Sequence, residues 1–168
     1  MPSHYEGRQD TVRALNAYIN LARAADSLLG RMSLELDEKG LTMGQFGALE
    51  TLLHLGPMCQ RTLGHKLLRS RGNITLVVDN LEKHGWVRRK PQKGDRRMIV
   101  IHLTPQGRRL IESVFPEHAQ TIKREMSVLT QREQESLRRI CRKLGRNDEG
   151  SSEQRRKKEK QNDTGSTK

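Results

Sequence analysis

The sequence of 168 residues predicts a mainly α-helical fold with one small β hairpin. Apolar residues recur at three- and four-residue spacing over several long stretches, which is the period of an amphipathic helix. Two segments that begin at Thr42 and Thr130 have the Thr-x-x-Gln/Glu pattern of a capping box at a helix start. β-prone side chains gather in one pair of segments, 86–90 and 98–103, on either side of a polar loop that contains Gly94.

The first predicted helix covers residues 11–36, which is more than a small domain needs for its own core. Its apolar stripe consists of Val12, Leu15, Ile19, Ala22, Ala25, Leu28, Leu29 and Met32. Only 33% of the residues in the chain are apolar and 3% are aromatic, so a single chain would bury little surface. We therefore expect part of this stripe to pack against a second copy of the chain.

The next three helices contain a helix-turn-helix. A capping box at residues 42–45 starts the second helix, and Gly56-Pro57 ends it. A short third helix is expected over residues 61–68. The fourth follows Ser70, its expected N-cap, and stops at Gly85. The residues expected to face inward are Phe46, Leu49, Leu53, Leu63, Leu67, Ile74, Val77, Val78 and Leu81. The fourth helix keeps a polar N-terminal half, so it is the candidate recognition helix.

The predicted hairpin follows as a wing, with Lys93-Gly94-Asp95-Arg96-Arg97 as its loop. Thr104-Pro105 then gives an N-cap and a proline at the first position of a fifth helix. A sixth helix starts at the second capping box, and its expected inner face consists of Leu137, Ile140, Cys141 and Leu144. After Gly145 the chain has no apolar side chain, so residues 146–168 are expected to be a disordered charged tail. The predicted fold class is a winged helix-turn-helix with six helices.

Positive charge is concentrated over residues 61–97, which hold eleven Lys or Arg against three Asp or Glu. This segment therefore carries +8 of the net +12 of the whole chain. An evenly charged surface would need no explanation beyond solubility, whereas charge gathered on a helix-turn-helix and hairpin favours a polyanion as partner. The shape of this unit fits duplex DNA, with a helix in one groove and a hairpin at its neighbour.

Three segments carry a family resemblance. They are SRGNITLVVDNLEKHGWV at residues 70–87, the wing from Asp95-Arg96-Arg97 to Leu103-Thr104-Pro105-Gln106-Gly107, and Phe115-Pro116-Glu117-His118 before Leu129-Thr130-Gln131-Arg132-Glu133. Together they resemble the MarR family of bacterial transcription regulators, over about residues 11–145. The wing pattern, Asp-x-Arg followed by a strand and Leu-Thr-x-x-Gly, is the most diagnostic part.

The resemblance implies an intertwined homodimer, which agrees with the argument from the long first helix. Residues 1–38 and 104–145 would be dimerisation segments, and residues 39–103 would be the DNA-binding domain. The function implied is a sequence-specific transcriptional regulator, a repressor that binds a pseudo-palindromic operator in double-stranded DNA. Such proteins are released by a small phenolic or other lipophilic effector, or by oxidation or metal.

The resemblance also assigns roles at the wing. Arg97 would be the arginine that enters the minor groove, for which a planar, weakly hydrated guanidinium is suited. Lys93 and Arg96 would contact the phosphate backbone. Asp95 would hold an arginine side chain in place through a charge-assisted pair.

On the recognition helix, residue chemistry predicts the contacts. Arg71 can bond guanine, Asn73 can bond adenine, and Thr75 can meet a thymine methyl or a phosphate. Ser70 is assigned to the DNA-binding set mainly as the N-cap. Arg61 and Thr62 lie at the start of the third helix, where free amides favour a phosphate.

Other functions were weighed against this interpretation. A nonspecific architectural DNA-binding protein stays an alternative, as does a redox-sensing regulator that uses Cys59 or Cys141. The two cysteines lie far apart without a CxxC, so each is expected to be reduced and buried. Cys59 with His54 or His65 is a weak nucleophile and base pair, so no enzyme is expected.

The histidines lie on separate predicted elements, so neither a metal nor another cofactor is expected. One of them, His118, falls on the apolar stripe of the fifth helix, where a hydrogen-bonded interface histidine is expected. No apolar run approaches the roughly eighteen residues of a membrane span, and no signal peptide is recognisable, so a cytoplasmic location is expected. The operator, the regulated genes and the effector are not encoded in any recognisable pattern.

Overall fold

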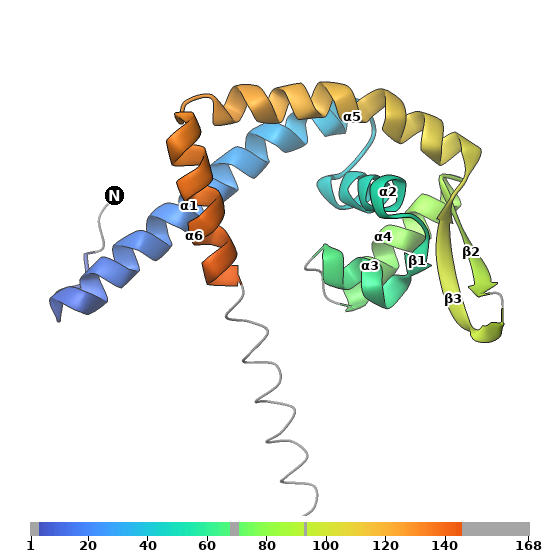
Figure 1. Ribbon diagram of the computed structural model, residues 1–168, viewed down its shortest axis with the longest axis horizontal. Helices are drawn as coiled ribbons and strands as arrows, with labels where there is room; N and C mark the ends of the chain where they lie inside the picture. The colour runs from blue at the N-terminus through green and yellow to red at the C-terminus, as the bar shows by residue number, and fades with distance from the viewer. Residues whose placement is uncertain (1–3, 68–70, 93, 146–168) are drawn as a thin grey trace, which may run out of the picture. The chain divides into compact units, whose positions relative to one another are not determined.

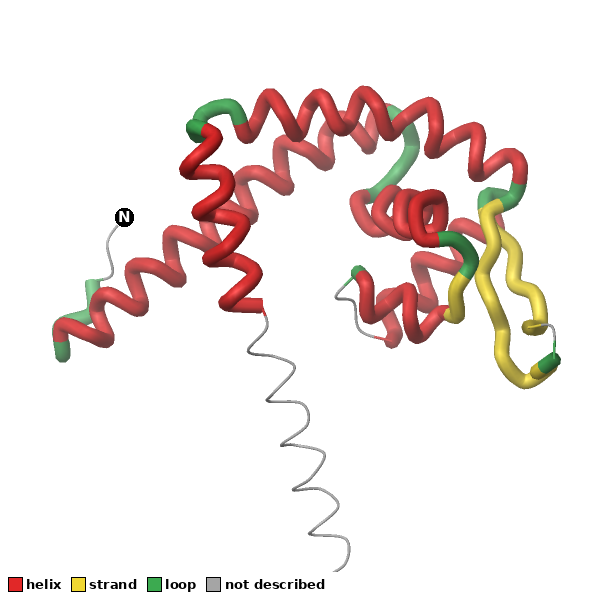
Figure 2. Tube along the Cα trace, viewed as in Figure 1, coloured by secondary structure: helices red, strands yellow, loops and turns green. Residues whose placement is uncertain are grey.

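The computed structural model describes residues 4–67, 71–92 and 94–145 of the chain. These ranges contain six α-helices and a three-stranded antiparallel sheet, so the predicted mainly α fold with a small wing is confirmed (Figures 1 and 2). In chain order the elements are α1 (Gln9–Glu38), α2 (Met43–Leu55), β1 (Met58–Cys59), α3 (Gln60–Lys66), α4 (Arg71–Lys83), β2 (Val87–Gln92), β3 (Asp95–Leu103), α5 (Pro105–Met126) and α6 (Gln131–Gly145). The expected tail, residues 146–168, lies outside the described residues.

The chain divides between Lys123 and Arg124 into two compact units. The first unit holds the only hydrophobic core found among the described residues, between α2, α3, α4, the sheet and the adjoining ends of α1 and α5. The residues of this core are Leu36, Leu41, Phe46, Ala48, Leu49, Leu52, Leu63, Ile74, Val78, Leu81, Val87, Ile101, Ile111 and Val114. Most of the residues predicted to face inward are therefore buried, while Leu53, Leu67 and Val77 are half-buried at its edge.

Local hydrogen bonds set the ends of the helices as predicted. Thr42 and Gln45 form a complete capping box at the start of α2. Thr130 and Glu133 form a second one before α6, with the Thr130 N–H donating to Glu133 Oε2 at 2.8 Å and the Glu133 N–H to Thr130 Oγ1 at 3.3 Å. At the end of α4, Gly85 has φ of +71°, and the amides after the helix donate back into its last turn. This glycine stops α4 and turns the chain into the wing.

The three strands are ordered β1-β3-β2, and β2 and β3 form the wing. Both wing strands extend further toward the tip than predicted, because the pairing continues past an irregularity at Pro91 and Gln92 to the pair Gln92–Asp95. A proline is tolerated there because β2 is an edge strand. The prediction that residues 95–97 belong to the connecting loop is therefore wrong, since they begin β3. Gly94, with φ of +95°, marks the turn.

The start of α5 is joined to the turn that follows α4. The Thr104 hydroxyl donates to the Gly85 carbonyl at 2.7 Å and accepts from the Gly107 N–H at 3.0 Å. The Thr104 N–H donates to the Trp86 carbonyl at 3.0 Å. Thr104 is thus the N-cap predicted from the sequence, and it also ties helix α5 to the base of the wing.

The apolar faces of α1 and α6 are largely uncovered in a single chain. Of the 30 residues of α1, only Met32 and Leu36 are buried. Helix α6 buries none, and Leu137, Ile140 and Leu144 are 37%, 57% and 56% exposed. The predicted inner face of α6 is therefore not buried by the described residues of a single chain. Among the described residues, no helix has the length and apolar character needed to cross a membrane.

Candidate nucleic-acid interface

Helix α4 has one buried face and one exposed polar face. Ile74, Val78 and Leu81 fix the buried face in the core. The side chains of Asn73 and Thr75 are exposed on the other side. Arg71 is the first residue of the helix, and Ser70 lies outside the described residues. Leu76 is also on the exposed side, at 63% exposure, which is a large apolar surface for a helix in water. The predicted recognition helix thus presents its N-terminal half outward.

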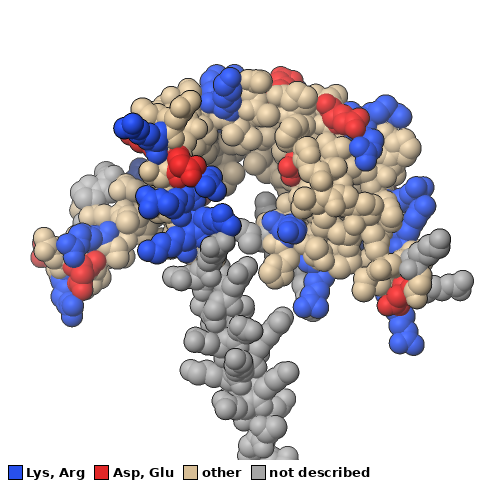
Figure 3. Space-filling model, viewed as in Figure 1, with Lys and Arg blue, Asp and Glu red and all other residues tan. Residues whose placement is uncertain are grey.

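The basic side chains of strand β2 lie on both faces of the wing. Arg88 and Lys90 are exposed and pair in register with His102 and Val100, so these side chains share one face of the sheet. Burial lowers the pKa of His102, and the charges of Lys90 and Arg88 lower it further. Arg89 lies between them and points to the opposite face. In the view of Figure 3, Lys and Arg side chains line the outer edge of the wing.

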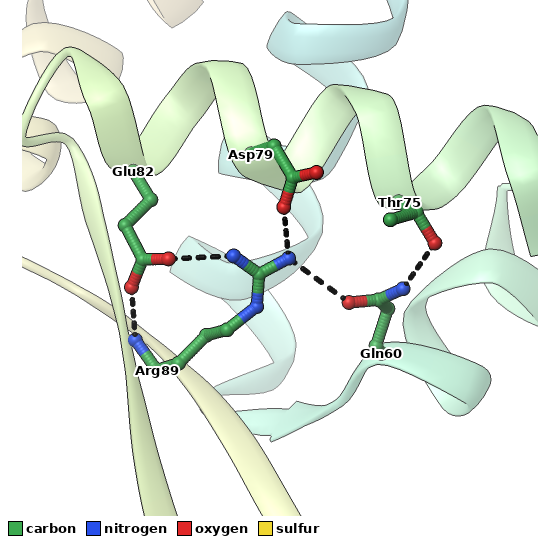
Figure 4. A network of polar contacts seen from close by, with 5 residues as sticks. All are labelled: Gln60, Thr75, Asp79, Glu82 and Arg89. Atoms are coloured by element: carbon green, nitrogen blue, oxygen red, sulfur yellow. Dashed lines mark hydrogen bonds and ion pairs between the residues drawn. The ribbon is translucent and has the colours of Figure 1, made fainter.

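Arg89 is held by two acids of α4 (Figure 4). Its backbone N–H donates to Glu82 Oε1 at 2.8 Å, its Nη1 donates to Glu82 Oε2 at 2.5 Å and its Nη2 donates to Asp79 Oδ1 at 2.5 Å. These bonds with the Arg89 amide and guanidinium hold the pKa of Glu82 below its usual range. Burial works against the charge of Arg89, but the bonds to Glu82 and Asp79 outweigh it and raise the pKa of the guanidinium.

The same network reaches α3 through Gln60. Arg89 Nη2 donates to Gln60 Oε1 at 3.2 Å, and Gln60 Nε2 donates to Thr75 Oγ1 at 2.7 Å. Neither Gln60 nor Arg89 was among the predicted site residues. The signal that could have found them is the i, i+3 spacing of Asp79 and Glu82, which puts two acids on one side of the recognition helix inside a basic segment.

The wing tip is ordered by Asp95. Its Oδ1 accepts a hydrogen bond from the Arg97 backbone N–H at 3.0 Å. The expectation was that Asp95 pairs with an arginine side chain, whereas its contact among the described residues is to the backbone. Arg97 is exposed, and Arg96 belongs to β3. Lys93 lies outside the described residues.

Helix α3 starts at Gln60 with Cys59 as its N-cap residue. Arg61 and Thr62 are exposed in its first turn, as predicted. The Cys59 Sγ lies 3.2 Å from the Thr62 hydroxyl. This hydrogen bond, helped by the Thr62 backbone N–H, lowers the pKa of the Cys59 thiol. Cys59 is only half-buried and Cys141 is exposed, so the expectation that both are buried is wrong. The hypothesis of a redox-sensing thiol stays a prediction.

His118 is buried, at 1% exposure, with its ring centroid 4.3 Å from that of Phe46. Its Nδ1 lies 3.8 Å from Glu35 Oε2, which is too long for a hydrogen bond. Neither Nδ1 nor the two Glu35 oxygens have a hydrogen-bond partner in the part of the chain that the structure describes. The prediction of a hydrogen-bonded histidine is therefore wrong at this nitrogen.

A hollow of about 410 Å³ lies between α1 and α2 in the first unit. Its walls are Leu29, Gly30, Ser33, Met43, Gly44 and Leu67, so they are mostly apolar. A volume of this size suits a small ligand. Over residues 4–67, 71–92 and 94–145 no group of three or more His, Cys, Asp or Glu is placed to hold a metal ion.

A helix-turn-helix with an outward-facing recognition helix and a basic wing defines a winged-helix DNA-binding protein. A model of the MarR family matches residues 41–99. The HTH-type transcriptional regulator MhqR of Bacillus subtilis is 34% identical over 137 residues, which cover 82% of this chain and 94% of MhqR. The chain therefore belongs to the MarR family, a family of transcription regulators and not of enzymes.

Solved structures show the same fold. Sco3205 of Streptomyces coelicolor, a MarR family regulator in complex with DNA, superposes with a TM-score of 0.76 at 22% identity, over 86% of this chain and 92% of that one. BpsR of Bordetella bronchiseptica, whose DNA binding is regulated by 6-hydroxynicotinic acid, gives a TM-score of 0.70 at 22% identity, over 77% and 98%. Family and fold together make this chain a DNA-binding regulator of transcription.

Proposed function

We propose that the chain is a repressor that binds a pseudo-palindromic operator as a homodimer in the bacterial cytoplasm. The observation that carries this proposal is the polar outer face of α4, which lies beside a wing whose outer face and tip are basic. A helix of this kind fits the major groove, and a hairpin beside it reaches the flanking minor groove. A dimer presents two such units, so its target repeats with two-fold symmetry.

Base reading is assigned to the first turns of α4. We assign Arg71 to a guanine and Asn73 to an adenine, because their side chains can bond two edge atoms of those bases at once. The methyl group of Thr75 suits the methyl group of a thymine. Ser70 is assigned to cap the start of the helix, as the sequence predicts.

The wing is assigned to the minor groove. Arg97 is exposed at the start of β3, and its backbone is fixed by the Asp95 carboxylate. This bond supports the assignment of Arg97 as the inserted arginine, since it limits the directions that the side chain can take. Lys93 and Arg96 are assigned to the phosphates on either side of the groove.

Helix α3 is assigned to the phosphate backbone through Arg61 and Thr62. With about six to eight cations of the dimer on phosphates, the affinity falls about a thousandfold or more for a fourfold rise in salt. An incidental basic surface with no phosphate contacts would show a far weaker dependence.

Dimerisation is assigned to residues 1–38 and 104–145, which flank the DNA-binding domain at 39–103. The uncovered apolar faces of α1 and α6 support this division. Burying these faces in a second chain removes apolar surface from water, and this is the main driving force of obligate dimers.

The hollow between α1 and α2 is assigned to a small phenolic or lipophilic effector. Its volume of about 410 Å³ and its apolar walls suit one aromatic ring. Because BpsR responds to a hydroxylated aromatic acid, the first compounds to test are acids of this class. Release of the operator in fluorescence anisotropy would identify an effector, and Leu29→Trp, which fills the hollow, should abolish the response.

Selection of bound duplexes from a random library at physiological salt tests the main proposal. The expected result is an enriched sequence with two-fold symmetry, and dimers in sedimentation at micromolar concentration. Equal displacement by unrelated duplex would show a nonspecific architectural protein instead. Single chains in sedimentation would contradict the dimer.

A further inference from the structure

Arg89 differs from the other cations of the wing, because its contacts are to protein. The guanidinium lies between Glu82 and Asp79 of α4 and is 27% exposed at the side chain. Two carboxylates within ion-pair distance balance its charge, so attraction to a phosphate is weakened. Charge-assisted hydrogen bonds to two partly buried carboxylates are also costly to rearrange. We conclude that Arg89, on β2, holds its partners on α4 and α3 in place and does not bind DNA directly.

The bond from Arg89 determines how the Gln60 amide is oriented. A guanidinium has only donors, so the amide atom that faces it must be the oxygen. The nitrogen of the amide then faces Thr75 and donates to its hydroxyl, as the 2.7 Å contact shows (Figure 4). The position of Arg89 therefore decides which way the Gln60 amide faces: its oxygen toward Arg89 and its nitrogen toward Thr75.

This bond acts on a side chain with two accessible rotamers. Threonine in a helix divides between two χ1 angles, since its hydroxyl can turn to a carbonyl of the preceding turn or away from it. A hydroxyl that accepts from Gln60 is kept at one of these angles. The methyl group of Thr75 sits on the same Cβ, so its direction is then fixed as well.

We propose that Gln60 and Arg89 are positioning residues for base recognition: they hold the methyl group of Thr75 in one direction on the exposed face of α4. The pair thereby sharpens the preference for thymine at the base pair that Thr75 meets. This inference rests on the proposed function, and it adds two residues that need not touch the DNA.

The test compares binding of the full chain to the selected operator and to duplexes with one base pair changed at each position. Gln60→Ala removes both bonds of the amide. Gln60→Glu keeps an acceptor for Arg89, and the Thr75 hydroxyl can donate to the other carboxylate oxygen, so this variant keeps the contact to Thr75 with its direction reversed. Arg89→Lys keeps the charge and loses the planar fork that reaches Glu82, Asp79 and Gln60 together.

Gln60→Ala and Arg89→Lys should lose discrimination at the same base pair, by about tenfold, while discrimination elsewhere stays as in the wild type. Gln60→Glu, which keeps a contact to Thr75, should retain discrimination at that base pair. Thr75→Ser, which removes the methyl group, should also lose discrimination at that base pair. In the Thr75→Ser background, Gln60→Ala should cause no further loss, because the group that it positions is gone. A general loss of fold would instead weaken binding to every duplex alike.

The binding data distinguish failure of the proposed function from failure of the positioning role. If the wild type shows no base preference at all, the proposed function fails, and this inference fails with it. If the wild type has a preference that Gln60→Ala and Arg89→Lys both keep unchanged, the proposed function stands and the positioning role is overturned. Additive losses from Gln60→Ala and Thr75→Ser would also overturn it.

Discussion

The backbone of Gly107 lies directly against the carbonyl of Trp86. A Cβ atom built on Gly107 would stand 1.9 Å from the Trp86 oxygen, far inside any real contact. The first turn of α5 can therefore approach the base of the wing only because residue 107 has no side chain. This explains in physical terms why the Leu-Thr-x-x-Gly pattern ends in glycine.

Gly107→Ala should destabilise the chain by about 2 kcal/mol or more, because the helix must move away from Trp86. Thermal unfolding followed by circular dichroism measures this as a lower Tm. Gly72→Ala is the matched control, since an added Cβ at this exposed helical position meets nothing within 4 Å. It should keep or slightly raise the Tm. Equal effects of the two substitutions would contradict the close contact.

Arg97→Ala should weaken operator binding strongly and leave the dimer intact, because Arg97 is exposed and carries no core contact. Because Arg97 is assigned to the minor groove and not to a phosphate, the slope of log affinity against log salt should fall by less than the 0.9 or so expected for each lost phosphate contact. Fluorescence anisotropy at several salt concentrations measures both effects. Unchanged binding would refute the assignment of Arg97 to the minor groove.

Glu82→Gln should change the pH dependence of stability. The pKa of Glu82 lies below its ordinary value of 4.5 in the folded chain, so ionised Glu82 stabilises the fold. This contribution is complete above the unfolded pKa and is lost as pH falls through the lower, folded value. Urea unfolding should therefore show a gap between wild type and Glu82→Gln that is largest near pH 7 and shrinks below about pH 4.5.

The control for this measurement is Glu6→Gln, an exposed change before α1. It should give a small difference from the wild type at every pH. A gap for Glu82→Gln that stays constant from pH 7 down through the lowered pKa of Glu82 would show that the ionised carboxylate does not support the fold.

Thr62→Val should slow the alkylation of Cys59 at neutral pH. The Thr62 hydroxyl is the main cause of the lowered thiol pKa, so its removal moves the pKa up and leaves less thiolate. Iodoacetamide rates measured across pH in a Cys141→Ser background isolate this thiol. In the converse chain, with Cys59→Ser, the rate at Cys141 should not respond to Thr62→Val. A pH profile of Cys59 that does not shift would contradict the contact.

Ile140→Glu should convert dimers into single chains. Ile140 is 57% exposed on a helix that buries no residue, and a charge there opposes burial in a second chain. Sedimentation velocity at micromolar concentration measures the change. Gln131→Glu, at the exposed first position of α6, adds the same charge away from the apolar face and should leave the dimer unchanged. Dimers in both variants would exclude α6 from the interface.

Sequence patterns predicted the helix boundaries well where the signals are local. The capping boxes at Thr42 and Thr130 and the N-cap at Thr104 act within one turn, so spacing alone is enough to recognise them. Gly85 was recognisable for the same reason. The buried stripe of α4 followed from its period, and the order of elements led to the winged helix-turn-helix.

The features that the sequence did not predict depend on contacts between distant parts. The role of Arg89 emerges only when β2 packs against α4, which brings it to acids ten and seven residues earlier in the chain. The longer wing strands depend on pairing across the hairpin. The inner face of α6 was inferred from its period, but period does not say whether the covering surface belongs to the same chain.

Thr104 links helix α5 to the point where α4 ends and the wing begins. Its hydroxyl and amide connect the first turn of α5 to the carbonyls of Gly85 and Trp86, where the recognition helix has ended and the wing begins. A shift of the N-terminal part of α5 would therefore act on the end of α4 and the start of the wing at one joint. Under the proposed function, such a shift would move the helix and the hairpin assigned to the two DNA grooves together.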